Sequence, residues 1–434
     1  MTPAARLSAA IEVLAEIFDR RRPAADALKD WGLSHRFAGS GDRAAIAGLV
    51  YDALRRRASS AWMMGAETPR AIVLGMLSRE RGLDSTAVAR LADGSRFAPA
   101  PLTADERRRL DAAELAAAPP WVAGDYPEWL DPQMAEAFGA ERAEEGAALA
   151  ARAPLDLRVN TLKTTVSRAA EALAHLGAGP GRWSPVGLRI PLDPDARSPG
   201  IHAEPAFVKG QVEVQDEGSQ LAALMSEARP GEQVVDLCAG AGGKTLALAA
   251  MMENRGQIYA TDPDKRRLAP IHDRLERAGV RNVQVRTPRP GSDPLADLAG
   301  RADLVFVDAP CSGSGAWRRN PDAKWRLRPA ALERRRAEQA AVLDRAASLV
   351  KPGGRIAYVT CSVLAGENGT QIGAFLARDR RFSVVPPGEV AAAALGERAF
   401  LFGRAVLLSD TGLLMTPRRT GTDGFFVSLL RRSS

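Results

Sequence analysis

Two of the chain's three cysteines stand where an apolar run gives way to a loop rich in glycine and serine. Cys311 follows a run that ends in Asp308, and Cys361 closes a similar run farther along the chain. A free cysteine on its own is usually a small buried hydrophobe. Two cysteines in comparable positions, one of them close to an aspartate, favour thiol chemistry instead. Arginines nearby and a helix start would lower the pKa of such thiols and favour the thiolate.

A second stretch, VVDLCAGAGGKT at residues 234–245, reads as a strand that runs into a glycine-rich turn and opens a helix. A phosphate-binding P-loop would need glycine at Cys238, and a dinucleotide fingerprint that starts at Gly240 would need glycine at Thr245, so both patterns fail. Asp262 ends the next apolar run, a place that suits the hydroxyls of a ribose. A nucleoside held without a phosphate clamp indicates S-adenosyl-L-methionine, although a purely structural turn stays open.

A thiolate, an acid and a methyl donor together suit one reaction. Carbon 5 of a pyrimidine is not nucleophilic until it is activated, and addition of Cys361 to C6 would activate it. Asp308 would hold the N3/N4 edge of the ring and stabilise its protonated form. The pyrimidine must leave its stack to be reached, so we expect unpaired RNA or a flipped base as the substrate.

The elements that would position these residues change in kind along the chain. Residues 1–125 show apolar positions at helical spacing, which predicts an all-helical domain. Residues 127–205 predict a small α+β domain that begins with a helix at about 132–152 and presents arginines such as Arg158 to RNA. Over residues 206–434, short β-branched runs alternate with helical stretches, which predicts a doubly wound, Rossmann-like α/β fold.

A doubly wound sheet binds its ligand at the carboxyl ends of its strands. The run that ends at Asp308 would be the fourth strand, and the run that ends at Cys361 would be the fifth. We therefore expect these two strands to be neighbours. Their ends would bring Cys311 and Cys361 to the same rim, near the glycine-rich turn.

The composition limits the class of protein and its partners. The net charge is +7, and the basic side chains are nearly all arginine, whose planar fork binds phosphate. Short arginine clusters can be solvated helix faces, but their sum favours a polyanionic partner, most simply nucleic acid. Three widely spaced cysteines argue against a disulfide framework and a zinc site, and no apolar run is long enough to span a membrane. We expect a cytoplasmic protein that needs no metal.

Three motifs resemble those of the RsmB/Nop2-type RNA 5-methylcytosine methyltransferases. DLCAGAGGKT resembles the cofactor motif of this family, DAPCSGSG its acid-plus-cysteine motif, and TCSVLAGENG its second cysteine motif. The N-terminal helices are similar to the NusB-like RNA-binding domain of the bacterial ribosomal enzymes. The resemblance implies methyl transfer from S-adenosyl-L-methionine to C5 of a cytosine in RNA, most simply 16S ribosomal RNA.

By this resemblance, Cys361 is the nucleophile and Cys311 helps to break the covalent bond to the product. Lys244 would reach the active site, and Asp308 would lie between the cofactor and the base. Cys238 would have no thiol chemistry of its own. The residues implied in cofactor binding are Cys238, Ala239, Gly240, Ala241, Gly242, Gly243, Lys244, Asp262 and Asp308.

Two positions depart from the family pattern. Ala241 replaces a proline of the glycine-rich loop, a mild change because the backbone amides remain. The third strand of the family ends in an acid that contacts the adenine, but here Arg286 follows that strand and Asp293 comes late in the loop. This departure bears on cofactor affinity.

Other functions stay open on the sequence alone. Transfer RNA is the alternative substrate, and an RNA-binding or assembly factor that kept the fold without turnover is the alternative class. An exocyclic-amine methyltransferase would need an Asn/Asp-Pro-Pro-aromatic turn where this chain has DAPC. Trp317 and Trp325 would either stack on bases or pack in a core. A monomer is the simplest expectation.

Overall fold

The computed structural model describes residues 1–112, 115, 117–192 and 199–434. The chain divides into two compact units, which are described separately. The helical unit comprises Met1–Arg152 and Trp317–Leu327. The sheet unit comprises Ala153–Ala316 and Arg328–Ser434.

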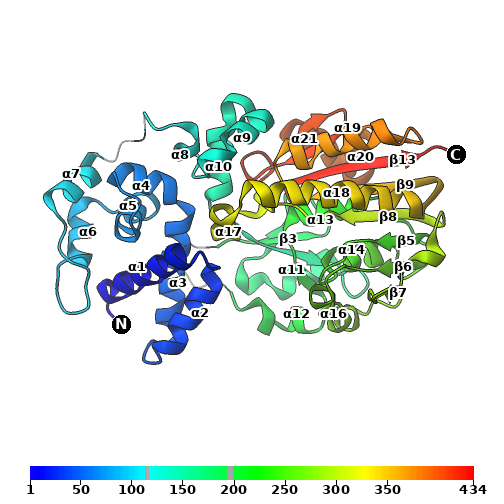
Figure 1. The fold of residues 1–434 in the computed structure, drawn as a ribbon. Coiled ribbons are helices and arrows are strands. Elements are labelled where there is room, and N and C mark those ends of the chain that lie inside the picture. The colour runs from blue at the N-terminus through cyan, green and yellow to red at the C-terminus, as the bar shows by residue number, and fades with distance from the viewer. Residues whose placement is uncertain (113–114, 116, 193–198) are drawn as a thin grey trace. The chain divides into compact units, whose positions relative to one another are not determined.

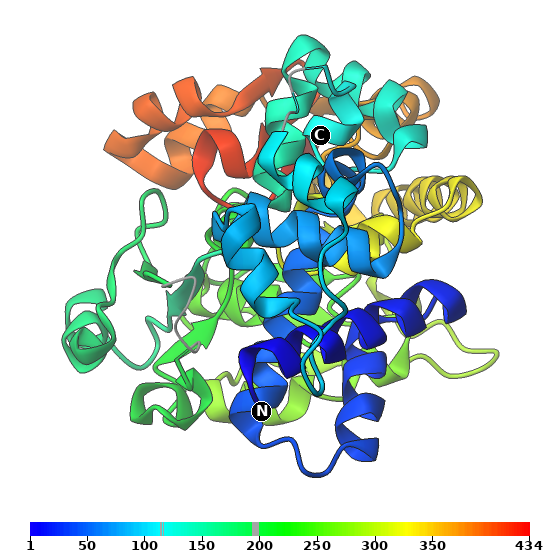
Figure 2. The ribbon, with the colours of Figure 1, turned by 90° about the vertical axis from the view of Figure 1, so that its left-hand side faces the viewer.

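The regular elements described in the helical unit are all helices (Figures 1 and 2), as the spacing of its apolar residues predicts. Its core forms where α1 (Pro3–Arg20), α3 (Ser40–Arg55) and α5 (Pro69–Arg81) pack on one another. The hydroxyl of Thr2 caps α1 and that of Thr68 caps α5, because each accepts a hydrogen bond from a backbone N–H of the first turn. The other α-helices are α2 (Ala24–Ser34), α4 (Arg57–Met64), α6 (Ser85–Leu91), α7 (Ala104–Ala112), α8 (Pro120–Ala123), α9 (Asp131–Phe138), α10 (Arg142–Ala150) and α17 (Pro321–Arg326).

Helices α9 and α10 stand where the sequence predicts one helix at about 132–152. Gly139 has a φ of 57°, a left-handed conformation that ends α9 before α10 begins.

The segment Trp317–Leu327 follows DAPCSGSG in the sequence but belongs to the helical unit. The indole N–H of Trp325 donates to the carbonyl of Leu54 at 2.7 Å, and the ring packs against the core of that unit. Trp317 is 1% exposed. Trp317 therefore packs in the interior, and stacking on bases is wrong for it. Trp325 is only partly buried against the core, so base stacking by its exposed part stays a prediction.

The arginines of one cluster, Arg55 and Arg56, bind groups inside the helical unit. Arg55 is buried and donates to the carbonyl of Ala151 at 3.2 Å. Arg56 pairs with Glu80 at 2.8 Å and lies 3.6 Å from the carboxylate of Asp125. These guanidinium groups hold helices together, so they add little to any surface that meets a polyanion.

The sheet unit begins with a small antiparallel sheet in the order β2-β3-β1-β4. Leu157 and Leu188 of this sheet are buried with Ala169 of α11 (Val166–Ala172) in one apolar cluster. The strands are β1 (Leu155–Val159), β2 (Gly179–Pro180), β3 (Gly187–Ile190) and β4 (Val212–Val214). Strand β4 completes the sheet, although we expected the small domain to end at residue 205.

Arg158 of β1 does not face RNA, and that prediction is wrong. The side chain is 3% exposed, and its Nε donates to the side-chain oxygen of Gln215 at 2.6 Å. Burial lowers the pKa of Arg158 to about 10, against the charge of Glu213, its partner across the β1–β4 ladder. The guanidinium of Arg158 therefore interacts with Gln215 and Glu213 inside the sheet unit.

The large sheet has the strand order β11-β12-β13-β9-β8-β5-β6-β7, with β10 paired to β13. Figure 1 shows the part of this order from β13 to β7. Strands β5 to β9 run parallel to one another, and β13 runs antiparallel to β9. The strands are β5 (Gln233–Asp236), β6 (Gln257–Ala260), β7 (Val283–Val285), β8 (Ala302–Asp308), β9 (Val350–Thr360), β10 (Phe382–Val384), β11 (Leu407–Ser409), β12 (Gly412–Met415) and β13 (Phe425–Arg432). This confirms the expected Rossmann-like α/β fold.

The middle of the large sheet is buried on both faces. Leu304, Val305, Phe306 and Val307 of β8 are all 0% exposed, as expected for a central parallel strand covered by helices on each side. The α-helices connected to the sheet are α12 (Pro205–Val208), α13 (Glu217–Leu224), α14 (Gly243–Met251), α15 (Lys265–Leu268), α16 (Ile271–Ala278), α18 (Pro329–Leu349), α19 (Gly369–Arg378), α20 (Pro387–Leu395), α21 (Ala399–Ala405) and α22 (Pro417–Thr420).

Strands β8 and β9 are neighbours, as predicted. Asp308 pairs with Val359 in their parallel register, and β5 lies on the other side of β8 with Asp236 opposite Phe306. The carboxyl ends of these strands therefore share one rim of the sheet, from which the glycine-rich turn and both cysteine loops emerge.

Candidate active site

The two cysteines of the rim face each other. The Sγ atoms of Cys311 and Cys361 are 3.4 Å apart, and both side chains are half-buried. The hydrogen bond to Cys361, burial and the charge of Cys361 hold the pKa of Cys311 well above its usual range. The prediction of a lowered pKa is therefore wrong for Cys311, because a neighbouring thiol and burial outweigh any helix or arginine nearby.

Asp308 and Lys244 form an ion pair on the same rim. The Lys244 ammonium donates to the Asp308 carboxylate at 2.7 Å, from the first turn of α14 to the end of β8. Burial alone would lower the pKa of Lys244, but the charge and hydrogen bond of Asp308 raise it above its usual value. The Phe425 ring centroid lies 5.1 Å from the same ammonium. Lys244 thus reaches the acid-plus-cysteine motif, as expected.

The glycine-rich loop turns sharply between β5 and α14. Gly240 and Gly242 have φ values of 51° and 85°, which side chains rarely adopt, and a Cβ on Gly242 would lie 2.5 Å from Ile271. The N–H of Gly240 donates to Asp262 at 2.9 Å. Cys238 is buried at the start of this loop, and burial raises its pKa, which suits its predicted lack of thiol chemistry.

The loop and its acids fit a nucleoside cofactor. Asp262, 1% exposed, accepts backbone N–H groups from Gly240 and Asp264 at 2.9 Å each, so its carboxylate is fixed at the end of β6. Asp236 ends β5, and its Oδ1 is buried without a partner among the described residues. Burial raises the pKa of Asp236 to about 7, against the hydrogen bond from Thr245. An unmatched buried acid oxygen beside a glycine cradle suits a ligand that carries donors.

Asp236 was missed on the sequence, although it stands within the glycine-rich motif. Asp262 could be recognised because it ends a strand at the distance from the glycine-rich loop that is typical of a ribose-binding acid. Asp236 has no such signal, because in the sequence it is simply the last residue of a buried strand.

The third strand ends without an acid, as the sequence indicates. Arg286 follows β7 and is engaged by Asp297. Asp293 pairs instead with Arg345 of α18 at 2.6 Å. Both acids of this loop are therefore bound to arginines.

A set of four residues, here called the cysteine-loop network, joins the two cysteine loops. It was missed on the sequence, and its centre is Glu367, which stands six residues after Cys361 in the second cysteine motif. The network consists of Ser312, Gln339, Ser362 and Glu367.

Two glycines connect the first cysteine loop to the approach of β13. The N–H of Gly424 donates to the carbonyl of Gly315 at 2.9 Å, and the N–H of Gly315 donates to the carbonyl of Cys361 at 3.0 Å. A Cβ on Gly315 would lie 2.0 Å from the Gly424 oxygen. Neither backbone could approach so closely with a side chain at this point.

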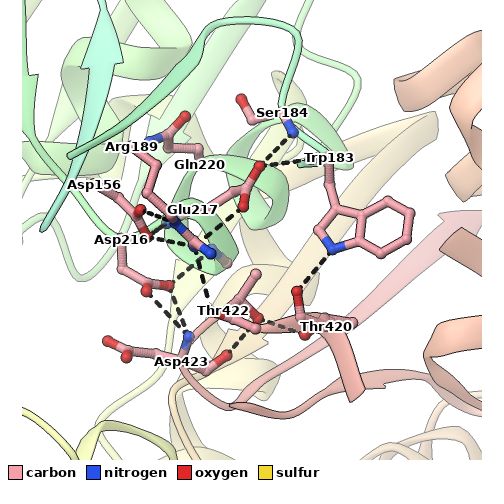
Figure 3. A network of polar contacts seen from close by, with 12 residues as sticks. Asp156, Trp183, Ser184, Arg189, Asp216, Glu217, Gln220, Thr420, Thr422 and Asp423 are labelled. Carbon is pink, nitrogen blue, oxygen red and sulfur yellow. Dashed lines mark hydrogen bonds and ion pairs between the residues drawn. The ribbon is translucent and has the colours of Figure 1, made fainter. Parts of the chain in front are cut away.

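A second set, here called the junction network, links the small sheet to α13 and to the turn before β13 (Figure 3). Arg189 of β3 binds Asp156 of β1 at 2.6 Å and Glu217 of α13 at 3.3 Å. Asp216 caps α13 and accepts the N–H of Asp423 at 3.0 Å. The small sheet is thereby tied to the segment that carries Gly424. The network consists of Asp156, Arg189, Asp216, Glu217 and Asp423.

Comparison with known proteins identifies the family. The model for 16S rRNA methyltransferase RsmB/F matches residues 223–431, and that for the ferredoxin-like domain of RsmF/B-like methyltransferases matches residues 126–194. A Synechocystis protein named probable ribosomal RNA small subunit methyltransferase B is 32% identical over 319 residues, 71% of this chain and 67% of that protein. The chain belongs to the RsmB/F family. Its proteins are S-adenosylmethionine-dependent methyltransferases, which confirms the expected class of cofactor.

Another relative aligns over a similar share of this chain. A Cronobacter sakazakii protein named ribosomal RNA small subunit methyltransferase F is 32% identical over 69% of this chain and 62% of that protein. The chain thus aligns with about two thirds of the length of these curated relatives. Among solved structures, the crystal structure of PH0851 is 27% identical, with a TM-score of 0.69, and covers 100% of this chain and 99% of that one.

The part of the chain that the structure describes lacks two kinds of feature. No helix there is long and apolar enough to cross a lipid bilayer. No three His, Cys, Asp or Glu side chains in that part of the chain are grouped so that they could hold a metal ion. The cytoplasmic location and the monomeric state stay predictions.

Proposed function

We propose that this chain transfers a methyl group from S-adenosyl-L-methionine to C5 of a cytosine in 16S ribosomal RNA, through a covalent adduct with Cys361. The observation that carries the proposal is the pair of thiols, 3.4 Å apart, on the rim that also carries the Asp308–Lys244 ion pair. Structural cysteines need no acid and no glycine loop beside them, whereas activation of a pyrimidine ring needs a thiolate and an acid together.

The cofactor would lie against the glycine-rich loop from Cys238 to Lys244. Asp262 would accept the ribose hydroxyls, and the unmatched oxygen of Asp236 would accept a donor of the cofactor. When bound, S-adenosyl-L-methionine supplies an electrophilic methyl group. Asp308 stands between this loop and the cysteines, because it ends the strand next to β5.

The reaction has two covalent stages. In the first, the Cys361 thiolate would form a bond to C6 of the cytosine, and the ring would take a proton from water at N3, so that C5 becomes nucleophilic. C5 would then take the methyl group as the bond from that methyl to the cofactor's sulfur breaks, which leaves the sulfur as a neutral thioether. In the second, C5 loses its proton to a base, the C6–sulfur bond breaks, and the electron pair returns to Cys361. The ring gives back the N3 proton, and the net change replaces one C5 hydrogen with methyl.

Three side chains support Cys361. Asp308 holds the N3/N4 edge and stabilises the protonated ring. Lys244 fixes the Asp308 carboxylate through the 2.7 Å ion pair. Cys311, in contact with Cys361, assists release of the product as the adduct breaks.

The names of the relatives and the charge of the chain support ribosomal RNA as the substrate. Relatives are named ribosomal RNA small subunit methyltransferases B and F. The net charge of +7 favours a polyanion. The helical unit would serve as the NusB-like RNA-binding domain, and the small sheet as a second RNA-binding element.

The test is methylation of defined RNA. Purified protein with S-adenosyl-L-methionine would be given unmodified 16S ribosomal RNA and, separately, unmodified transfer RNA, and 5-methylcytosine would be mapped by bisulfite sequencing. A discrete site in ribosomal RNA, absent with Cys361→Ala, supports the proposal, and a site in transfer RNA alone would reassign the substrate. Failure of a folded, cofactor-binding protein to methylate either RNA would favour the non-catalytic RNA-binding factor.

A further inference from the structure

The Glu367 carboxylate is buried where the two cysteine loops meet. It is 0% exposed and ends a short 3₁₀ turn, Ala365–Glu367, that follows the second cysteine. Its Oε1 accepts the N–H of Ser312 at 2.8 Å and the amide of Gln339 at 3.0 Å. Its Oε2 accepts the hydroxyls of Ser312 at 2.5 Å and Ser362 at 2.6 Å. A buried carboxylate with this many donors is fixed in place.

These donors come from the residues that directly follow the cysteines. Ser312 follows Cys311 and Ser362 follows Cys361, and a single carboxylate oxygen accepts both hydroxyls. Ser314 adds a second link, since its hydroxyl lies 3.0 Å from that of Ser362. Glu367 therefore joins the two loops directly beside the thiols.

The charge of Glu367 also acts on the thiols. Its four described donors are neutral groups, so nothing among them cancels the negative charge. The hydrogen bond to Cys361, burial and the charge of Cys361, followed by the charge of Glu367, raise the pKa of Cys311, while the N–H of Gly313 opposes them. When two thiols are coupled, a negative charge that acts on one of them favours the proton on that thiol.

We propose that Glu367 is a positioning residue that locks the two cysteine loops together and directs their shared proton to Cys311, so that Cys361 is the thiolate. This inference rests on the proposed function for its meaning, because it says which thiol is ready to attack the base. Glu367 would thus determine which of the two thiols attacks the base, without itself contacting the RNA.

The charge is tested by the reactivity of each thiol in the full-length protein, without RNA or cofactor. Brief treatment with iodoacetamide from about pH 6 to about pH 10, followed by peptide mass spectrometry, gives a pH profile for each cysteine. We expect Cys361 to react first in the wild type. In Glu367→Gln, which keeps the size of the side chain, the profile of Cys311 should move to lower pH by about one unit. Identical Cys311 profiles in the two proteins would overturn the proposal.

Two controls separate charge from folding. Glu389→Gln makes the same change at an exposed position of α20 and should leave both profiles unchanged. Buried Cys238 should stay unmodified in every folded variant. If Glu367→Gln does not fold, Ser362→Ala removes the hydroxyl that donates to Glu367, together with its contacts to Ser314 and Leu364, and leaves the charge of Glu367 in place. It should loosen the loops without moving the Cys311 profile, and a shift there would count against the charge argument.

The positioning half is tested with diamide, which oxidises two nearby thiols to a disulfide and is itself reduced to a hydrazine. The wild type should form the Cys311–Cys361 disulfide at least about threefold faster than Glu367→Ala at a pH where both proteins hold the same fraction of thiolate. Equal rates would show that the strands alone set the distance. Neither thiol assay needs methyl transfer, so an inactive wild type would reject the proposed function and leave this inference to be judged on its own results.

Discussion

The sheet unit holds two carboxylate networks that look alike in composition and differ in what completes them. In the junction network, Arg189 binds Asp156 and Glu217, and Glu217 also accepts two backbone N–H groups. In the cysteine-loop network, the donors that Glu367 accepts from the described residues are all neutral. In the junction network the cation offsets the negative charge of the buried carboxylates beside it. In the cysteine-loop network neutral donors leave the charge of Glu367 to act on neighbouring groups.

This difference assigns the two networks to different tasks. The junction network joins the small sheet to α13 and the turn before β13 and should matter for stability (Figure 3). The cysteine-loop network joins the two loops that carry the thiols and should matter for their reactivity. The predictions below separate these tasks, from the largest expected effect to the smallest.

The cysteines themselves should give the largest effect. Cys361→Ala should lower methyl transfer by at least about a thousandfold, because the step that activates C5 is lost. Cys311→Ala should still form the covalent bond to RNA and accumulate it, because release is impaired. Bisulfite sequencing measures the methyl transfer, and denaturing gels of protein incubated with RNA and cofactor measure the covalent adduct. Equal accumulation in the two variants would remove the distinction between the thiols.

Loss of the cation should destabilise the junction network without changing the thiols. Arg189→Met leaves Asp156 and Glu217 buried without their cation, and should lower the free energy of unfolding by roughly 3 kcal/mol. Burial already raises the pKa of Glu217, and the charge of Arg189 opposes this rise. The pKa of Glu217 should therefore rise further in Arg189→Met. Denaturant titration measures the stability, and the iodoacetamide profiles of the cysteines should match the wild type.

The matched control is Arg255→Met, which breaks an exposed pair with Glu253. It should change the free energy of unfolding by less than about 1 kcal/mol. A similar loss in both variants would mean that burial of the junction network contributes nothing.

The contact between Gly315 and Gly424 links the two networks, and its loss should have an intermediate effect. Gly315→Ala places a methyl group 2.0 Å from the Gly424 oxygen, so one backbone must move. We expect a loss of about 1–3 kcal/mol in stability, together with slower methyl transfer, since the N–H of Gly315 bonds the carbonyl of Cys361. Gly388→Ala, where a Cβ meets nothing within 4 Å, should leave both quantities unchanged.

Buried Lys324 in the helical unit should change only the pH dependence of stability. Burial lowers the pKa of Lys324 to about 7, despite the charge of Asp125. Between about pH 7 and about pH 10 the unfolded chain holds this proton and the folded chain does not, so the free energy of unfolding rises with pH, by up to about 1.4 kcal/mol per unit. Lys324→Met should flatten this rise in denaturant titrations at several pH values. Parallel curves for the two proteins would contradict the buried charge.

Much of this site could be predicted from short stretches of sequence. The end of β8 and the end of β9 were expected side by side because consecutive strands of a doubly wound sheet are often neighbours, and Asp308, Cys311 and Cys361 do share one rim. Lys244 was placed correctly through the family resemblance alone. In these cases the residues lie within a few positions of a strand end, where local pattern determines location.

What the sequence did not predict depends on partners far along the chain. Arg158 reads as an exposed arginine until Gln215 is found beside it. The Cys311 pKa depends on a thiol and a carboxylate brought together by folding. Glu367 lies in a quoted motif, but its role appears only when Ser312 and Ser362 converge on one oxygen. Burial and pairing of charges are properties of the folded chain.

The central claim is covalent attack by Cys361 on a cytosine ring, and RNA that contains 5-fluorocytidine tests it most directly. Fluorine at C5 cannot leave as a proton does, so the adduct should persist after methyl transfer. We predict a stable protein–RNA adduct that needs S-adenosyl-L-methionine, is absent in Cys361→Ala, and maps by mass spectrometry to the Cys361 peptide. No adduct with any RNA tested, or an adduct that maps to Cys311, would contradict the account.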